Sequence, residues 1–230
     1  MSSLPPAILE AVLVGKVREH PAGEPDGPFA QPWRSAYIKD PVDGPVRIHK
    51  LGLEGDQVAD TRVHGGLEQS VLAYPACHYR QWRSELGIAE MGPGGFGENL
   101  CVTGLDETSV CIGDQYQVGD ALLEVSLPRL PCASINRRWR DTSLAQEVGR
   151  LSRTGWYFRV LREGEVCAGD RLERIAHPMT EWTVAKVLQL RLNNNRDSLE
   201  QAGRLASCEL LAAHWREHFA DRVTRQSGVR

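Results

Sequence analysis

The sequence VCIGDQYQVGDALLEVSLPRLPC, residues 110–132, carries the pattern that decides the fold. It contains Gly-Asp twice, at 113–114 and 119–120, and each pair precedes a run in which apolar and polar residues alternate. A glycine-containing turn followed by alternation with a period of two predicts a turn that leads into a half-buried strand. The segment therefore predicts two strands, and Pro128 ends the second of them.

The same pattern recurs along the chain. Gly-Asp precedes alternating residues in CAGDRLERI, residues 167–175, and EGDQVADTRV, residues 54–63, begins in the same way. Short β-type runs bounded by glycine, proline or aspartate fill residues 8–176, beginning with ILEAVLVGKV at 8–17. Many short strands with closely spaced turns are typical of a closed barrel or a sandwich.

Two helices interrupt the predicted strands. YPACHYRQWRSELG, residues 74–87, has Pro75 in the first turn and Gly87 as a C-cap. TSLAQEVGRLSRTG, residues 142–155, begins with the capping box Ser143-x-x-Gln146. Both segments predict short helices at the periphery of the barrel.

After residue 178 the pattern becomes helical. TEWTVAKVLQL predicts a first helix, capped by Thr180, and RLNNNRDS is the turn that follows it. DSLEQAGRLA predicts a second helix, which opens with an Asp197-x-x-Glu200 box, and SCELLAAHWREHFADRV predicts a third. We therefore predict a mainly β (α+β) protein, with a β-barrel and short peripheral helices at 1–178 and a three-helix domain at 179–230. So small a bundle has little core of its own, so we expect it to dock on the barrel or on a partner.

Composition excludes several classes. The 230 residues are 41% hydrophobic and 25% charged, as in an ordinary soluble globular protein, and the net charge of −3 gives no sign of nucleic-acid binding. The apolar run Ala7–Val14 is short and contains Glu10, so we expect neither a signal peptide nor a membrane span, and a cytoplasmic location. Six widely spaced cysteines without a C-x-x-C pair predict free thiols.

Cys132 is the first candidate functional residue. It follows Pro131 in the loop after the strand that ends at Pro128, which places it at the rim of the barrel. Arg129, Arg137 and Arg138 lie close in sequence, and nearby cations lower the pKa of a thiol. From these residues alone Cys132 is either a reactive thiol or a small packed side chain.

Three further stretches could bind a ligand. His64 precedes Gly65 and Gly66, where backbone N–H groups could reach a ligand, or where a tight turn holds a structural histidine. GPGGFGENL, residues 92–100, is a flexible loop that offers the acid Glu98 and the amide of Asn99. In QPWRSAYIKDPV, residues 31–42, Arg34, Ser35 and Lys39 could bind phosphate or face solvent.

Two other patterns give only weak evidence of a functional site. His214 and His218 are four residues apart on a helix, but no third metal ligand is evident. The cluster RRWR at 137–140 could suggest DNA contact, and the acidic net charge argues against it.

Taken together, the order HGG, FGEN, PR-x-PC and GWY-x-RV, followed by a helical tail, resembles the MOSC domain family. The stretches at 51–82, 94–105, 110–132 and 153–172 carry this resemblance. Within the family, the order of the motifs and the helical tail most specifically resemble the bacterial YiiM subfamily. The family has a β-barrel core, which agrees with the strands predicted above.

The resemblance implies a molybdenum cofactor of the molybdopterin type. In related enzymes, such as the mitochondrial amidoxime-reducing component, the cysteine that corresponds to Cys132 binds molybdenum. A soft thiolate suits that metal, and the anionic cofactor requires a basic pocket. The implied cofactor-binding residues are Ser35, Lys39, His64, Gly65, Gly66, Asn99, Arg129 and Arg137, with Cys132 as the metal ligand and Glu98 as a proton donor.

The implied activity is two-electron reduction of the N–O bond in small N-hydroxylated substrates such as 6-hydroxylaminopurine. Because the chain has no flavin or nicotinamide motif, we expect electrons from a separate donor protein, and the C-terminal helices could dock that donor or a second subunit in a homodimer. The alternative is a sulfur carrier in which Cys132 holds a persulfide for transfer to a metal centre or a partner protein. A third option is a binding module for the pterin without redox activity.

Overall fold

The computed structural model describes residues 6–193, 195 and 198–226, and the statements below concern these residues. The strands are β1 (Ile8–Val14), β2 (Arg18–His20), β3 (Trp33–Ser35), β4 (Asp40–Pro41), β5 (Val46–His49), β6 (Gly52–Leu53), β7 (Val71–Pro75), β8 (Leu100–Thr103), β9 (Gln115–Val118), β10 (Ala121–Pro128), β11 (Trp156–Arg162), β12 (Gly164–Val166) and β13 (Leu172–Ala176). The helices are α1 (Cys77–Leu86), α2 (Ala133–Trp139), α3 (Leu144–Arg150), α4 (Val184–Leu192), α5 (Leu199–Ala206) and α6 (Ala213–Gln226).

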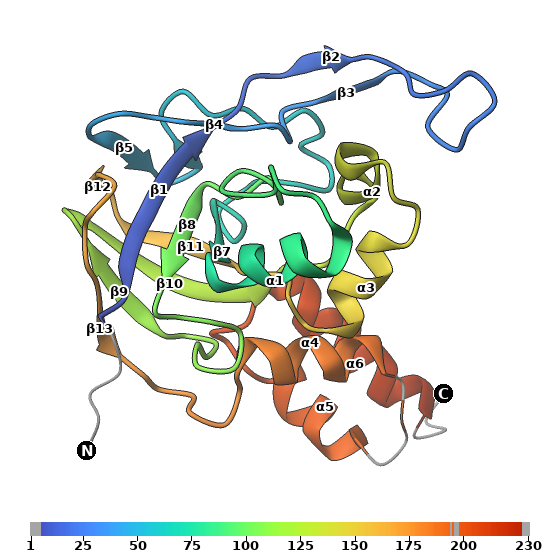
Figure 1. Cartoon of the computed structure of the whole chain (residues 1–230). Coiled ribbons are helices and arrows are strands. Elements are labelled where there is room, and N and C mark those ends of the chain that lie inside the picture. Colours follow the sequence, from blue (N-terminus) through green and yellow to red (C-terminus); the bar gives the residue numbers. More distant parts are fainter. Residues whose placement is uncertain (1–5, 194, 196–197, 227–230) are drawn as a thin grey trace.

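An eight-stranded mixed sheet forms the centre of the molecule. Its order is β13-β9-β10-β11-β7-β8-β1-β4, and only β7 and β8 run parallel among these neighbours. The sheet curls so that its two sides approach each other: Ile8 of β1 makes an isolated bridge to Arg171, just before β13 (Figure 1). Three-stranded and two-stranded sheets, β12-β5-β6 and β2-β3, complete the strands. The predicted barrel class is confirmed as this curled, barrel-like sheet with short helices around it.

The segment that decided the fold forms β9 and β10. In β9 half-buried and buried positions alternate as predicted, and β10 ends at Pro128. The prediction of half-burial is wrong for β10, in which every residue except the half-buried Leu122 is buried, including the polar Glu124 and Ser126. Helix α4 contacts β10, so this strand is covered on both faces.

The Gly55-Asp56 pair does not begin a strand. Residues 54–69 form an irregular segment after β6, because the Asp56 carboxylate turns inward instead of marking an exposed turn. It accepts hydrogen bonds from the backbone N–H of Gly15 at 2.7 Å and from the Asn99 amide at 2.8 Å. Partners that are distant in sequence thus override the local strand pattern.

Several helix ends differ from the predictions. Pro75 is the last residue of β7, and α1 begins at Cys77, whereas Gly87 is the expected left-handed C-cap with φ 69°. The cap of α4 is Thr183 and not Thr180, since the Thr183 side chain accepts the N–H of Lys186. Thr180 and Thr183 are both suitable N-cap residues, so the local sequence alone does not indicate which of them caps α4.

The starts of the other predicted helices also differ from the prediction or lie outside the described residues. The predicted Ser143 box does not form; instead the Asp141 carboxylate accepts the N–H groups of Ser143 and Leu144. Asp197 of the other predicted box lies outside the described residues. The predicted third C-terminal helix begins later than expected, at Ala213.

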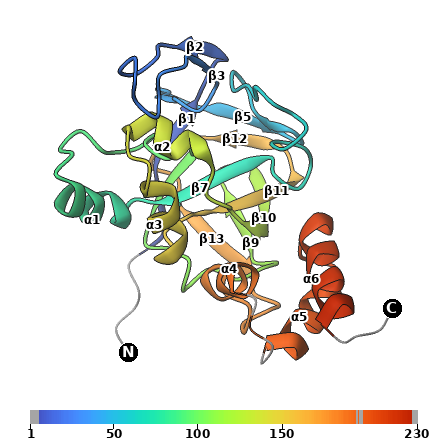
Figure 2. The same cartoon turned by 90° about the vertical axis from the view of Figure 1, so that its right-hand side faces the viewer.

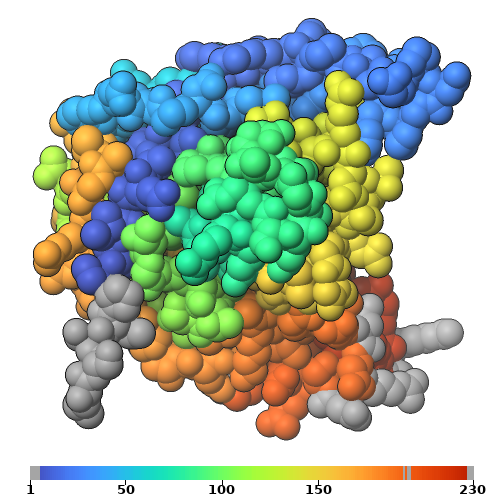
Figure 3. Space-filling view, in the orientation of Figure 1, coloured from blue at the N-terminus to red at the C-terminus, as the bar shows by residue number. Residues whose placement is uncertain are grey.

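The C-terminal helices pack against the barrel. One apolar cluster runs from barrel residues such as Val125 and Phe158 to Leu205, Trp215 and Phe219 of the helices. Figure 2 shows α4, α5 and α6 gathered at one end of the sheet, and in Figure 3 they form a layer beneath the strands. A second cluster lies under α1, α2 and α3 and contains Trp82, Phe96 and other buried side chains. Within the described part of the chain, no helix combines the length and the apolar character that crossing a bilayer needs.

Candidate functional site

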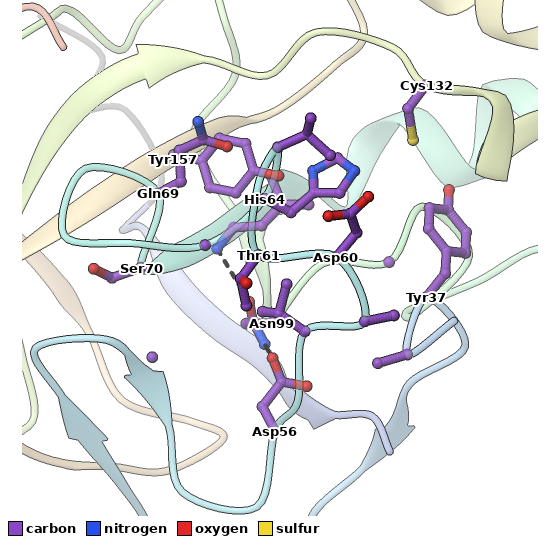
Figure 4. Close-up of a pocket in the computed structure, with 18 of the residues that line it drawn as sticks. Tyr37, Asp56, Asp60, Thr61, His64, Gln69, Ser70, Asn99, Cys132 and Tyr157 are labelled. Carbon is purple, nitrogen blue, oxygen red and sulfur yellow. Dashed lines mark hydrogen bonds between the residues drawn. The ribbon is translucent and has the colours of Figure 1, made fainter. Parts of the chain in front are cut away.

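A cavity of about 880 Å³ opens beside the end of β10. Its wall comes from segments far apart in sequence: residues 34–39, 51–65, 97–99 and 127–134, and the start of α6. Figure 4 shows side chains from these segments converging on one space, with the Cys132 thiol and the Tyr37 hydroxyl turned toward the same part of it. Since ligand sites are usually concave and few, this cavity is the candidate functional site.

Cys132 lies where the sequence placed it, in the loop that follows β10. It is the N-cap residue of α2, in extended conformation, and its side chain is half-buried in the cavity wall. Burial by itself raises the pKa of the thiol, but the Arg129 guanidinium and the N–H and hydroxyl of Ser134 together hold that pKa below its ordinary value. The guanidinium Nη2 lies 3.8 Å from Sγ. The surroundings of Cys132 on the cavity wall therefore favour its thiolate form.

Arg129 is the main cation of this wall. The residue is only 3% exposed, and its backbone N–H bonds to the Gly155 carbonyl, which ties the loop to the segment before β11. Its guanidinium carbon lies 5.8 Å from the centre of the Tyr37 ring. Among the described residues, the buried Nη1 of Arg129 and the hydroxyl of Tyr37 have no hydrogen-bond partner of good geometry. Buried polar groups are rarely left unpaired, so these two atoms indicate an anionic or polar ligand.

A buried polar network holds the floor of the cavity. Lys39, whose side chain is 7% exposed, forms an ion pair with Asp56, and the other Asp56 oxygen accepts from the Asn99 amide. Burial lowers the pKa of Lys39, and Asp56 counteracts part of that effect. The Asn99 carbonyl also accepts the Leu72 N–H at 3.2 Å. Lys39 and Asn99 thus line the cavity as predicted, but their polar atoms are engaged with the protein.

The HGG loop forms another side of the cavity. His64 and Gly65 line it, whereas Gly66 does not. Gly65 has φ 77°, a conformation that other residues rarely adopt. Burial, and then the charge of Arg129, lower the pKa of His64, so its imidazole is neutral at pH 7 and can donate or accept a hydrogen bond. Ser35 also lines the cavity, and its hydroxyl accepts the Tyr37 N–H.

The same loop is fixed to the C-terminal helices. The carboxylate of Glu68 accepts the N–H of Ala213, the first residue of α6, at 3.0 Å. Its backbone carbonyl accepts the Ser126 hydroxyl of β10 at 2.6 Å. These contacts hold the HGG loop between the barrel and α6, which itself adds His214 and Trp215 to the cavity wall.

Glu98 and Arg137 are not brought to the cavity. Glu98 is fully buried and accepts hydrogen bonds from the Tyr79 hydroxyl and from the N–H groups of Gly94 and Phe96. It shapes the glycine-rich loop and has no contact with the cavity space. Arg137 lies on α2 and donates to the Gln31 carbonyl at 3.3 Å, away from the cavity lining. Arg138 stacks on the Trp139 ring at 4.8 Å.

Sequence reasoning missed several lining residues, including Tyr37, Asp56, Tyr157 and Trp215. Three of them lay inside stretches already singled out: Tyr37 between Ser35 and Lys39, Asp56 in EGDQVADTRV, and Tyr157 in the GWY motif. Helix α2 was also missed. It has seven residues, and its N-cap Cys132 makes no side-chain cap bond, so no capping signal marks its start.

The profile of the MOSC domain family matches residues 60–173, which include the HGG loop, β10, Cys132 and β11. YiiM of Escherichia coli is 34% identical over 210 residues, a match that covers 89% of this chain and 87% of YiiM. The chain therefore belongs to the MOSC domain family. Within it, the chain is a YiiM-type protein, since the match to YiiM covers most of both chains.

Two further comparisons agree. The crystal structure of YiiM from Geobacillus stearothermophilus superposes with a TM-score of 0.78 at 28% identity, over 95% of this chain and 100% of that one. A protein named reductase from Gibberella moniliformis is 36% identical over 185 residues, which are 79% of this chain and 32% of that protein. This chain therefore corresponds to about a third of that longer relative.

Proposed function

We propose that this protein is an oxidoreductase that uses a molybdenum cofactor to reduce small N-hydroxylated compounds such as 6-hydroxylaminopurine. The family and the relative named reductase support the general reaction class. The observation that carries the proposal is the Cys132 thiol on the wall of a large cavity, where the neighbouring Arg129 guanidinium helps to lower its pKa. A soft sulfur ligand next to a guanidinium with one nitrogen, Nη1, unpaired among the described residues fits a metal cofactor that itself bears negative charge.

The residues present fit a group of the molybdopterin type. The buried Nη1 of Arg129 and the hydroxyl of Tyr37 lack partners among the described residues and can donate to anionic oxygen or sulfur atoms. Cys132 Sγ would be the metal ligand, and Arg34, Ser35 and Arg62 offer further polar groups around the same cavity. When bound, the cofactor supplies the two electrons that break the N–O bond.

The chain's own residues provide the binding and the proton supply. Arg129 lowers the pKa of Cys132 and would balance the charge of its thiolate. Neutral His64 faces the cavity and can pass a proton from solvent to the substrate nitrogen or oxygen, a role that Glu98 cannot fill from its buried position. Burial raises the pKa of Tyr157, so this phenol keeps its proton and can act as a donor to substrate.

The overall reaction takes up two electrons and two protons: an N-hydroxylated base gives the corresponding amine and water. In this proposal the electrons come from a separate donor protein. The rival function, a sulfur carrier with a persulfide on Cys132, uses the same thiol. However, a single extra sulfur atom would fill only a small part of the cavity of about 880 Å³. The size of the cavity favours the cofactor.

The test is to purify the protein from molybdenum-replete cells and measure bound molybdenum and pterin. We expect stoichiometric molybdenum in the wild type and in Cys167→Ser, whose half-buried thiol lies outside the cavity, and its loss in Cys132→Ser. The loaded protein should reduce hydroxylaminopurine or an amidoxime with a strong artificial electron donor. A metal-free wild type that carries a reducible extra sulfur on Cys132 would overturn the proposal in favour of the sulfur carrier. Metal without reduction would favour a binding module.

A further inference from the structure

Two turns of this protein have the same sequence pattern and the same geometry. Cys111-Ile-Gly-Asp114 precedes β9, and Cys167-Ala-Gly-Asp170 precedes β13. In each turn the aspartate carboxylate accepts the cysteine N–H, at 3.0 Å and 2.8 Å respectively. The glycines, Gly113 and Gly169, both have positive φ, of 80° and 96°. The bond from the cysteine N–H to the aspartate carboxylate is thus common to both turns.

The first turn has additional groups that the second lacks. His177 Nδ1 lies 2.6 Å from Asp114 Oδ1, and the ligand atoms of Cys111, Asp114 and His177 all lie within 4.8 Å of one another. The Cys111 thiol also lies 3.6 Å from the carbonyl oxygen of Thr180. Because the turn at 167–170 forms without a histidine, turn formation does not explain why His177 is placed here.

We propose that Cys111, Asp114 and His177 form a binding site for a divalent transition-metal ion of the zinc type. Thiolate, imidazole and carboxylate are the ligands that zinc takes in proteins. Bonds of about 2.0–2.3 Å in tetrahedral geometry bring ligand atoms to roughly 3–4 Å from one another, so only a small contraction is needed. The Thr180 carbonyl or a water molecule can complete the coordination.

Burial and charge suit such a site. Asp114 is fully buried and Cys111 is 2% exposed, whereas the His177 side chain is 32% exposed and gives the ion a route from solvent. A thiolate and a carboxylate together neutralise a divalent ion. Binding releases the thiol proton to solvent, and the metal replaces the hydrogen bond between His177 Nδ1 and Asp114 Oδ1.

One neighbouring cation opposes the metal. Arg174 Nη1 lies 3.5 Å from Asp114 Oδ2, but the Arg174 side chain is 40% exposed and already donates to the Ser109 carbonyl at 3.3 Å. It can therefore remain bonded to Ser109 while Asp114 turns its other oxygen to the ion. The required adjustment is small.

The site would fasten the C-terminal helices to the barrel. Residues 177–183 connect β13 to α4, and Ile112 donates to the Trp182 carbonyl at 3.0 Å while Val184 donates to that of Val110 at 2.9 Å. A metal on His177 and Cys111 would fix the beginning of this connection. None of the three ligands lines the cavity of the proposed reductase, so the two sites are separate.

The test uses cobalt(II) as a spectroscopic probe on the full chain, in a Cys132→Ser background that removes the cavity thiol. We expect one equivalent of cobalt, with thiolate-to-cobalt charge-transfer absorption that one equivalent of zinc abolishes. Adding Cys167→Ser, the matched cysteine of the second turn, should leave this absorption unchanged. Adding Cys111→Ser should remove it, and adding His177→Gln should weaken cobalt binding at least about tenfold.

Zinc should also raise the melting temperature of the Cys132→Ser protein but not that of the Cys132→Ser/Cys111→Ser protein. If Cys111→Ser does not fold, the partly exposed His177 decides the question: cobalt affinity unchanged in His177→Gln overturns the proposal. Charge-transfer absorption that survives Cys111→Ser, or that never develops in the Cys132→Ser background, overturns it as well. These outcomes do not depend on molybdenum content, so they leave the proposed function to its own test.

Discussion

Cys132 and Cys101 are both thiols in the walls of the barrel, and their surroundings affect them in opposite ways. Cys101 lies in β8 and is fully buried; burial, and then the carboxylates of Glu98 and Glu10, raise its pKa. Cys132 is half-buried, and the cation Arg129 together with Ser134 outweighs the effect of burial and lowers its pKa. The comparison indicates that the nearest charge, and not burial alone, decides whether the pKa of a thiol is raised or lowered in this protein.

The strongest test of the comparison removes the cation. Arg129→Met should raise the pKa of Cys132, so the thiolate forms only at higher pH and burial again dominates, as at Cys101. At pH 7 we expect alkylation of Cys132 by iodoacetamide to slow at least about tenfold, which corresponds to one pKa unit, and bound molybdenum to be lost. The rate is measured by mass spectrometry of the peptide that contains Cys132, between pH 6 and 9.

Arg137→Met is the matched control, because Arg137 is near Cys132 in sequence but lies outside the cavity. It should alkylate like the wild type. Equal rates for the two arginine variants would show that general positive charge, and not the contact with Arg129, controls Cys132.

The pKa of His78 is also set by neighbouring groups against the effect of burial. Burial lowers the pKa of His78, but its contacts with Cys77 and Glu107 prevail and raise it to about 10. Its Nε2 lies 2.7 Å from Glu107 Oε2. A pKa that is higher in the folded state stabilises the fold below the unfolded value of 6.5, and that stability is lost as the pH rises toward 10.

We therefore expect His78→Gln to lower the free energy of unfolding by about 1.5–3 kcal/mol at pH 6, the range for hydrogen bonds to charged groups, and by less at pH 9.5. Urea denaturation of both proteins at the two pH values measures this difference. A difference that does not change with pH would mean that His78 is neutral in the folded protein.

Glu98 tests whether a carboxylate beside the buried thiol matters once burial is complete. Glu98→Gln should destabilise the fold by about 1–2 kcal/mol, because Glu98 holds the glycine-rich loop through Tyr79, Gly94 and Phe96. Cys101 should remain unreactive toward iodoacetamide, since burial is the largest influence on its pKa. Alkylation of Cys132 should not change; if it slows, Glu98 acts on the cavity in spite of its buried position.

The strand pattern of the fold was accessible from sequence, and the exceptions have a common cause. Gly-Asp turns followed by alternating residues correctly predicted β9, β10 and β13, and in the turns before β9 and β13 the aspartate accepts a cysteine N–H only three residues away. The fourth Gly-Asp failed because Asp56 is captured by Lys39 and Asn99 from distant segments. Local patterns predict local structure until a buried long-range contact competes with them.

The site divides in the same way. Cys132 and Arg129 are three residues apart in one loop, so sequence brought them together correctly. Tyr37 and Trp215 join them only through tertiary folding, and no spacing in the chain could indicate that. The opposite error occurred for Arg137, which is near Cys132 in sequence but is carried away on α2, a helix without a sequence signal at its start.

The smallest expected effect separates charge from hydrogen bonding at Cys132. Ser134→Ala removes the hydroxyl that bonds to the thiolate but keeps the backbone N–H of residue 134 and the guanidinium of Arg129. A single neutral hydrogen bond contributes about 0.5–1 kcal/mol, so alkylation at pH 7 should slow by about two- to fivefold, less than in Arg129→Met. In the double variant with Arg129→Met the Ser134 effect should persist, because the hydroxyl acts directly on sulfur. If Ser134→Ala instead slows alkylation more than Arg129→Met does, hydrogen bonding at the start of α2, and not the nearby cation, is what distinguishes Cys132 from Cys101.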